Sequence, residues 1–345
     1  MIDRTLSSCR TSCGLIAPLL ALMAAISIGS ARAAPGQLDP TFGNAGIVRT
    51  NLGSGADTGN AVAMQADGKI VMAGYSESGA KFDFALARFN VDGTLDTGFN
   101  GTGKVITSIG TGGDEALAIA IDASSRIVVA GYGASGTINK FALARYNTNG
   151  TLDTTFNGTG KVTTAIGTSN DAASSIAIDS GGRIVAAGYS FSGSHVDLAL
   201  ARYLDSGALD TSLAGTGRLV VTTPLPGDYY AAGVAIDVPG RIVLAGSVGL
   251  SGGDFAVARV LPSGGLDTAF GQGGIATASP SQSGATIWNA IARQADGSIV
   301  VAGTANAEGK SNVALARFNA NGTPDTSFNG TGAVTTAIGT SEDAA

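Results

Sequence analysis

The chain has 345 residues, with 20 Lys and Arg against 26 Asp and Glu, and a formal net charge of −6. An acidic chain does not offer the basic surface that nucleic-acid binding requires, so we expect no nucleic-acid partner. Its two cysteines, Cys9 and Cys13, lie close to the N-terminus. Disulfides and cysteine chemistry are therefore excluded from the remainder of the chain.

Residues 1–33 have the pattern of a secretory signal peptide. Arg4 and Arg10 precede an apolar run from residue 14 to residue 28, and the small-residue motif Ala31-Arg32-Ala33 follows. A membrane-spanning helix needs about 20 apolar residues, whereas this run is shorter and contains Pro18. We predict a secreted, periplasmic or cell-surface protein whose mature chain has no transmembrane segment.

Residues 34–345 are predicted to form a single repeat domain. Two markers recur every 57 residues, with one final spacing of 58: Arg88, Arg145, Arg202, Arg259 and Arg317, and Asp39, Asp96, Asp153, Asp210, Asp267 and Asp325. The repeats begin near residues 38, 95, 152, 209, 266 and 324, and the last is incomplete. Such a unit is too small to bury its own apolar face and depends on its neighbours for a core.

Each repeat contains four short segments rich in β-branched and apolar residues. In the third copy these are segment a (161–166), segment b (174–179), segment c (183–189) and segment d (197–203). Gly, Asn, Asp or Ser bound each segment, and no helical periodicity of sufficient length occurs after the signal peptide. The pattern predicts an all-β protein.

Residues 127–132 and 242–246 are apolar throughout, which indicates strands buried on both faces. We predict a β-propeller of four-stranded blades, with five complete repeats of about 57 residues and a partial sixth. We expect the Ala-Gly pair of segment c to let adjacent sheets approach closely. The connection from d to the next a, such as residues 147–160, is expected to cross from the outer edge of one blade to the inner strand of the next.

Two architectural alternatives stay open. A β-solenoid could place two or three coils in each repeat. Within a propeller, the incomplete last repeat favours a longer native chain over five blades closed by the last segment a.

Four motifs of the first repeats resemble the delta-60 repeat, a family of bacterial exported proteins. They are residues 38–43 (LDPTFG), 66–71 (ADGKIV), 73–75 (AGY) and 84–90 (FALARFN). The resemblance implies a propeller-like fold and export, and it brings no assigned activity or catalytic residue. The fourth copy departs from the pattern with Leu213 in place of Phe, so we expect its blade to be looser.

The repeated Arg and Asp residues allow two interpretations. Five arginines could form an anion-binding ring, or each Arg could hold segment d to the following loop by a charge-assisted hydrogen bond to the Asp. We favour the structural interpretation, because a residue needed once for chemistry has no reason to recur in every copy.

Other candidate sites are weaker. Residues 90–96 and 147–153 resemble the start of a calcium loop but lack the closing glutamate, so we expect no cofactor, with calcium as the alternative. His195 is the only histidine and lies in a variable loop, with no Gly-x-Ser-x-Gly motif to accompany it. We predict no catalytic residue.

The a–b and c–d connections vary between copies, and binding residues are usually found in such loops. We expect any ligand to meet this face, with Tyr229, Tyr230 and Trp288 as aromatic contacts, unless these rings only fill the interface between blades. The sequence thus favours a monomeric, non-catalytic binding module for an unknown protein or carbohydrate. An enzyme acting on an extracellular polymer and a structural or adhesive array are the alternatives.

Overall fold

The computed structural model describes residues 36–338, except residues 80, 194, 222–227, 239, 249–254, 280–285 and 308–309. Side chains of residues 247–248, 286–289 and 307 also lie outside the description. All regular elements of the described residues are β-strands. Among these residues no helix is long and apolar enough to cross a bilayer.

Twenty strands form five antiparallel four-stranded sheets, each built from strands consecutive in the sequence. The first three sheets are β1 (Asp57–Met64), β2 (Ile70–Ser78), β3 (Lys81–Phe89) and β4 (Lys104–Thr107); β5 (Asp114–Ile121), β6 (Ile127–Ser135), β7 (Ile138–Tyr146) and β8 (Lys161–Thr164); and β9 (Asp171–Ile178), β10 (Ile184–Ser192), β11 (His195–Tyr203) and β12 (Arg218–Val221). The last two are β13 (Tyr229–Ile236), β14 (Ile242–Val248), β15 (Phe255–Val260) and β16 (Ile275–Ala278); and β17 (Thr286–Arg293), β18 (Ile299–Ala307), β19 (Lys310–Phe318) and β20 (Ala333–Thr336).

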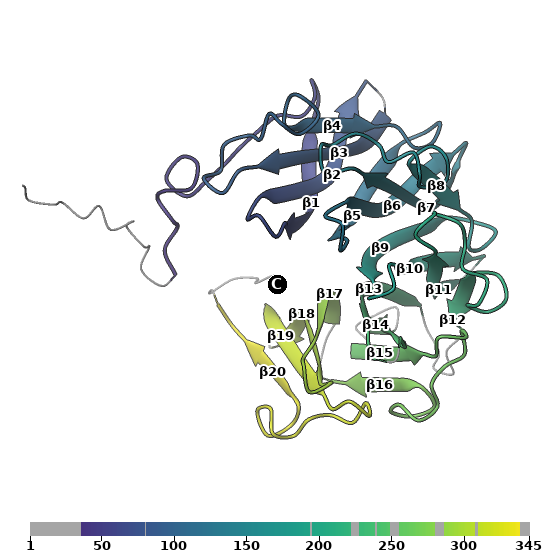
Figure 1. The fold of residues 1–345 in the computed structure, drawn as a ribbon. Helices are drawn as coiled ribbons and strands as arrows, with labels where there is room; N and C mark the ends of the chain where they lie inside the picture. Colours follow the sequence, from purple (N-terminus) through teal and green to yellow (C-terminus); the bar gives the residue numbers. More distant parts are fainter. Residues whose placement is uncertain are drawn as a thin grey trace, which may run out of the picture.

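The sheets fan around a common axis with their first strands innermost, and an opening separates the first sheet from the last (Figure 1). Successive innermost strands contact one another, β1 with β5, β5 with β9, β9 with β13 and β13 with β17. The prediction of a β-propeller with four-stranded blades is confirmed, and the β-solenoid alternative is wrong.

The predicted assignment of strands to blades is wrong. Segment a of each copy is the outermost strand of the preceding sheet, so β8 pairs with β7 and the innermost strand is segment b. The reason lies in residues 147–160, which fold back on their own sheet: Asp153 N donates to Arg145 O and Arg145 N donates to Gly160 O, both at 2.9 Å. The chain crosses between sheets through the shorter residues 165–170.

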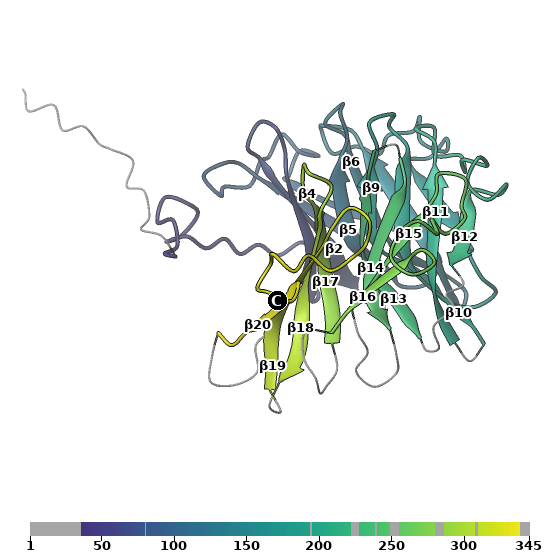
Figure 2. The same ribbon diagram turned by 90° about the horizontal axis from the view of Figure 1, so that it is seen from below.

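Loops emerge at two opposite ends of the strands (Figure 2). The constant face carries the loops from the first to the second strand and from the third to the fourth, such as residues 122–126 and 147–160. The variable face carries the other connections, such as residues 108–113 and 136–137. This grouping follows from the antiparallel order of every sheet.

A hydrophobic cluster lies between each pair of neighbouring sheets. The second strand of a sheet contributes to the clusters on both sides: Val129 of β6 packs toward the first sheet and Val128 toward the third, and neither is exposed. The predicted burial of both faces is confirmed for this strand. Alternating orientation of successive side chains explains how one apolar run serves two interfaces.

The glycine of the Ala-Gly pair has a different role from the one predicted. A Cβ on Gly131 would lie 1.9 Å from the carbonyl oxygen of Glu115, which belongs to the neighbouring strand of the same sheet. The same clash occurs at Gly74 and Gly188. Each glycine faces a β-bulge in the innermost strand, so it permits close backbone approach within a blade.

Candidate functional site

The repeated Arg and Asp residues pair on the constant face. In every sheet Arg Nε lies close to Asp Oδ2: Arg88 and Asp96 at 2.7 Å, Arg145 and Asp153 at 2.8 Å, Arg202 and Asp210 at 2.8 Å, Arg259 and Asp267 at 2.8 Å, and Arg317 and Asp325 at 2.6 Å. Burial raises the pKa of Asp153, but hydrogen bonds from Thr155 and the charge of Arg145 outweigh it and hold this pKa below its ordinary value. The carboxylate is therefore the stable form.

Each arginine of the first four sheets also reaches the next sheet. Nη1 of Arg145 donates to the backbone carbonyl oxygen of Asp205 at 2.6 Å, and Nη1 of Arg202 donates to that of Pro262 at 2.9 Å. Nη2 of Arg145 donates to Thr155 Oγ1 at 3.2 Å. All three nitrogens of this guanidinium are thus engaged inside the protein, which argues against a ring of arginines open to an anion.

Phenylalanines cover these arginines in four of the five copies. The Arg145 guanidinium lies 4.7 Å from the ring centroid of Phe156, and Arg88 and Arg259 each lie 4.5 Å from their own phenylalanine. In the fourth copy Leu213 takes this place next to Arg202 and is fully buried. That copy lacks the cation–π contact and keeps the Arg202–Asp210 pair.

A second repeated aspartate was missed in the sequence. Asp57, Asp114 and Asp171 begin the innermost strands of the first three sheets, and Asp114 and Asp171 are fully buried. The Asp114 carboxylate accepts hydrogen bonds from the backbone N–H groups of Ile109 at 2.7 Å and Gly110 at 2.9 Å. These aspartates fix the loop that crosses between sheets, and their spacing of 57 residues could have identified them.

The three predicted aromatic contacts do not act as one group. Tyr229 and Tyr230 begin β13 at the variable face, but Tyr229 is buried whereas Tyr230 is 41% exposed. Opposite orientation of neighbouring strand residues explains the difference. The Trp288 side chain lies outside the described residues.

The structure instead brings Tyr230 into a row of aromatic residues near the variable face. Tyr75, Tyr132 and Tyr189 occupy the same position of β2, β6 and β10, and all are partly exposed. The ring of Tyr230 meets that of Tyr189 edge-on, with centroids 5.5 Å apart. Tyr189 also meets Phe191 edge-on at 5.7 Å.

A carboxylate lies within this row. The Tyr132 hydroxyl donates to Glu115 Oε2 at 2.7 Å, and Asn60 Nδ2 of the preceding sheet donates to Oε1 at 3.0 Å. Burial, followed by the hydrogen bond to Glu115, raises the pKa of Tyr132. Burial, followed by the Tyr230 ring and the Glu115 charge, also raises the pKa of Tyr189. Both hydroxyls therefore stay neutral at physiological pH and can bind a polar ligand by hydrogen bonds.

His195 and the two candidate calcium turns occupy ordinary surface positions. The His195 side chain is 69% exposed, and its Nδ1 lies 4.0 Å from Asp228 Oδ1. In the turn of residues 90–96, Asp92 Oδ1 accepts from the backbone N–H and the hydroxyl of Thr94. In the part of the chain that the structure describes, no three His, Cys, Asp or Glu side chains group as metal ligands.

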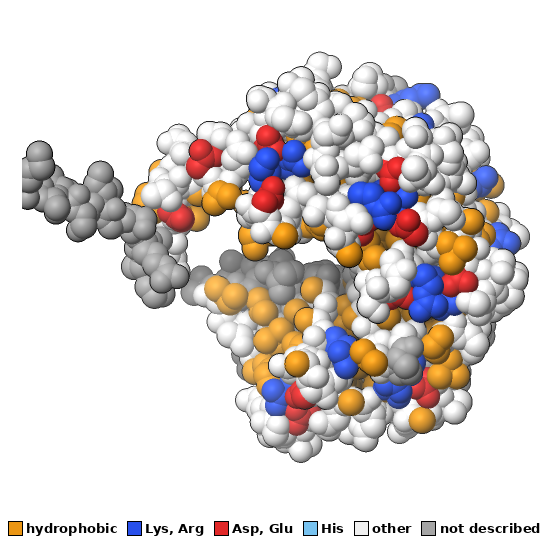
Figure 3. Space-filling view, viewed as in Figure 1, with side chains coloured by type: hydrophobic (Ala, Val, Ile, Leu, Met, Phe, Trp, Pro, Cys, Tyr) orange, Lys and Arg blue, Asp and Glu red, His pale blue; other side chains and the backbone are white. Residues whose placement is uncertain are grey.

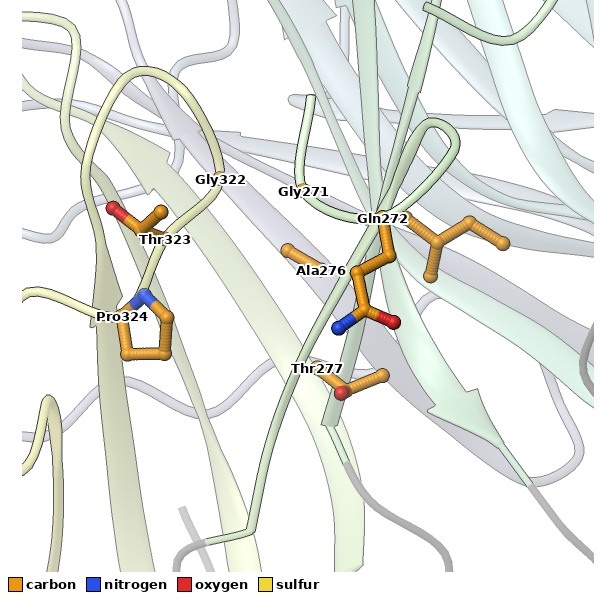
Figure 4. Close-up of a pocket in the computed structure, with 8 residues that line it drawn as sticks. Gly271, Gln272, Ala276, Thr277, Gly322, Thr323 and Pro324 are labelled. Carbon is orange, nitrogen blue, oxygen red and sulfur yellow. The ribbon is translucent and has the colours of Figure 1, made fainter. Parts of the chain in front are cut away.

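A pocket of about 420 Å³ lies between the outermost strand of the fourth sheet and a turn of the fifth (Figure 4). Its lining residues are Gly271, Gln272, Ile275, Ala276, Thr277, Gly322, Thr323 and Pro324. None of them carries a charge. This lining can accept neutral polar groups but supplies no acid or base.

Comparison with known proteins agrees with this geometry. A family model described as "Domain of unknown function (DUF5122) beta-propeller" matches residues 65–99, 123–156, 182–213, 240–270 and 294–328. Each match includes the second and third strands of one sheet and the Asp that pairs with its arginine. The chain is a repeat β-propeller.

Solved structures similar to this propeller include three with low sequence identity. They are the PQQ-bound form of an aldose sugar dehydrogenase from Streptomyces coelicolor (17% identity, 80% of this chain and 82% of that one, TM-score 0.39), Sqt1 from Chaetomium thermophilum (13%, 77% and 70%, 0.41) and an endo-arabinase from Bacteroides thetaiotaomicron (12%, 65% and 80%, 0.34). None of the curated proteins compared with the propeller matches it. At these TM-scores the similarities carry no argument about activity.

Proposed function

We propose that the protein is an exported propeller that binds a neutral carbohydrate polymer without transforming it. The observation that carries this proposal is the row of Tyr75, Tyr132, Tyr189 and Tyr230, with Glu115 held inside it. Aromatic rings offer apolar faces for the C–H groups of a sugar, while their hydroxyls and a carboxylate meet its hydroxyl groups. Equivalent positions on successive blades suit a ligand that is itself a repeating chain.

The surroundings of Glu115 favour binding over catalysis. Both oxygens of its carboxylate already accept hydrogen bonds, from Asn60 and from Tyr132. A carboxylate held in this way suits orientation of a ligand hydroxyl, whereas glycoside hydrolysis requires a pair of carboxyl groups in complementary roles. An acidic chain also favours a neutral polymer over an acidic one.

Affinity electrophoresis tests the proposal. The chain from residue 34 onward should be retarded in gels that contain xylan, mixed-linkage β-glucan or galactomannan, and should run freely in alginate. Tyr189→Ala and Tyr230→Ala should each weaken retention about tenfold, since a well-placed ring contributes about 0.5–1.5 kcal/mol beyond its buried area. Val238→Ala, at an exposed site on the constant face, is the matched control. Free migration in all four polymers, or retention that both tyrosine variants leave unchanged, would contradict carbohydrate binding on this face.

Export is a separate part of the proposal and rests on the signal-peptide pattern and the resemblance to the delta-60 repeat. Expression of the full sequence in a Gram-negative host should release a protein whose N-terminus is Ala34 into the periplasm or the medium. Replacing Ala31 and Ala33 with bulky residues should block this cleavage. Cytoplasmic accumulation of the uncleaved original chain would refute it.

A further inference from the structure

Residues 38–50 fold like the outer part of a blade, although they belong to none of the five sheets. Phe42 N donates to Asp39 O at 3.1 Å, as Phe99 N donates to Asp96 O at 2.9 Å one copy later. Within the described residues, positions 48–50 pair with no strand. They correspond in the repeat to β4, the outermost strand of the first sheet.

The same segment docks on the first sheet as one blade docks on the next. Gly43 N donates to Asp92 O at 2.7 Å. The corresponding bond between the first and second sheets runs from Asn100 N to Asn149 O at 2.6 Å. Residues 38–50 thus take the position of the outer strand and loop of a blade that would precede the first sheet.

The flank of the first sheet beside this segment is apolar and exposed. It carries Val62, Met64 and Met72, which are 65%, 73% and 39% exposed. One copy later, Val129 is fully buried between the first and second sheets, and Ile119 and Ile121 pack against the same cluster. The first sheet therefore presents, uncovered, a surface that the preceding blade covers in the second sheet.

The fifth sheet is uncovered on its opposite flank. Val300 and Leu315 are partly exposed, whereas their counterparts in the second sheet, Val128 and Leu143, are fully buried. The side chain of Arg317 is 25% exposed, against 1% for Arg145. Figure 3 shows hydrophobic side chains along both borders of the opening between the first and last sheets.

We propose that this opening is the docking surface for a three-stranded β-meander built from segments b, c and d of the same repeat. The meander completes a six-bladed ring, and its third strand pairs with residues 47–50 as the outermost strand. The fifth sheet cannot supply these strands, because β19 already pairs with its own outermost strand, β20. An apolar strand of the segment c type would bury the flanks of the first and fifth sheets together, as β6 buries both of its neighbours.

The experiment uses the two methionines of the chain after residue 33, Met64 and Met72, both of which lie on the exposed flank. Residues 34–345 are compared with a chain in which a copy of residues 174–203 follows Ala345. This junction keeps the register, since residues 339–345 repeat the pattern of 167–173. Mass spectrometry follows methionine oxidation by dilute hydrogen peroxide, and light scattering gives the oligomeric state.

We expect the original chain to be a monomer with rapid oxidation of Met64. In the extended chain, oxidation should slow about tenfold or more, because the closed ring must open before the sulfur is reached. A disulfide provides a second readout. Arg49→Cys should crosslink with Ala199→Cys of the appended copy, since the corresponding residues Ile106 and Ala85 are direct partners. Thr50→Cys, one residue out of register, should not crosslink.

Three results would overturn the proposal. Slow oxidation of Met64 in the monomeric original chain would mean that the five sheets close by themselves. Protection that appears only with dimerisation would identify a second copy as the occupant. Rapid oxidation together with no crosslink in the extended chain would show that the meander does not dock. The measurements on the original chain stand even where the extended chain fails to fold.

Discussion

Arg145 in the second sheet donates a hydrogen bond from Nη1 to the backbone carbonyl oxygen of Asp205 in the third, 2.6 Å away. The same guanidinium pairs through Nε with Asp153 of its own sheet. One side chain thus holds a loop to its strand and one blade to the next. A bond of this kind explains why the residue recurs in each copy of an array whose blades depend on their neighbours.

Arg145→Ala should lower the free energy of unfolding by about 3–5 kcal/mol, because it leaves the buried Asp153 without its cation. Urea denaturation measures the change. Arg317→Ala is the matched variant, since Arg317 is more exposed than Arg145 and should cost only about 1 kcal/mol. Equal losses at the two positions would contradict the inter-blade role.

The propeller should lose stability in acid. Side-chain hydrogen bonding from Lys69 lowers the pKa of Asp96, and hydrogen bonds outweigh burial to lower those of Asp153 and Asp210. A carboxyl group whose folded pKa lies below the unfolded value near 3.9 stabilises the protein above that pH. This contribution is lost as the pH falls through the folded pKa values.

Urea midpoints measured between pH 2 and pH 6 test this dependence. The midpoint should be steady above about pH 4.5 and fall below it. Asp153→Asn should lower the midpoint at pH 6 and make the acid limb shallower. A midpoint that does not change below pH 4 would refute the prediction.

Asp114→Ala should destabilise the protein by about 2–3 kcal/mol, because the backbone N–H groups of Ile109 and Gly110 lose their acceptor. Hydrogen exchange of these two amides should accelerate more than exchange in β6. Asp57→Ala is the comparison, since Asp57 is partly exposed and should cost less. Unchanged exchange at residues 109 and 110 would show that the carboxylate does not fix the loop.

Gly131→Ala should cost about 2 kcal/mol or more, because the new Cβ would meet the Glu115 carbonyl oxygen at 1.9 Å. Gly265→Ala is the control, as no heavy atom lies within 4 Å of a Cβ there and its φ is not positive. Thermal unfolding of the two variants gives the comparison. Equal melting temperatures would mean that β5 shifts to accept the methyl group.

The repeat itself could be predicted because its information is local and copied. Alternating and continuous apolar runs predict strands in any context, and equal spacing of Arg145 and Arg202 predicts equivalent blades. Strand membership could not be predicted in this way. Segment a is four residues long in the structure and fits either edge of a blade, so its assignment depends on how residues 147–160 fold back on β7.

The candidate site shows the same limit. Tyr230 was identified from its place in a variable connection, but its contact with Tyr189, 41 positions earlier, depends on the packing of the third sheet against the fourth. Glu115 carried no signal, because a single carboxylate at a strand end is common. Only the fold brings it within hydrogen-bonding distance of Asn60 and Tyr132.

By itself the sequence determined that the protein is built from equal β units, each with a paired Arg and Asp and a glycine in the second strand. Only the tertiary structure decided which strand is innermost, which rings form a row and which flanks stay uncovered. The physical reason is that period and polarity act within one unit. Burial, in contrast, is shared between units and is settled when the sheets pack against one another.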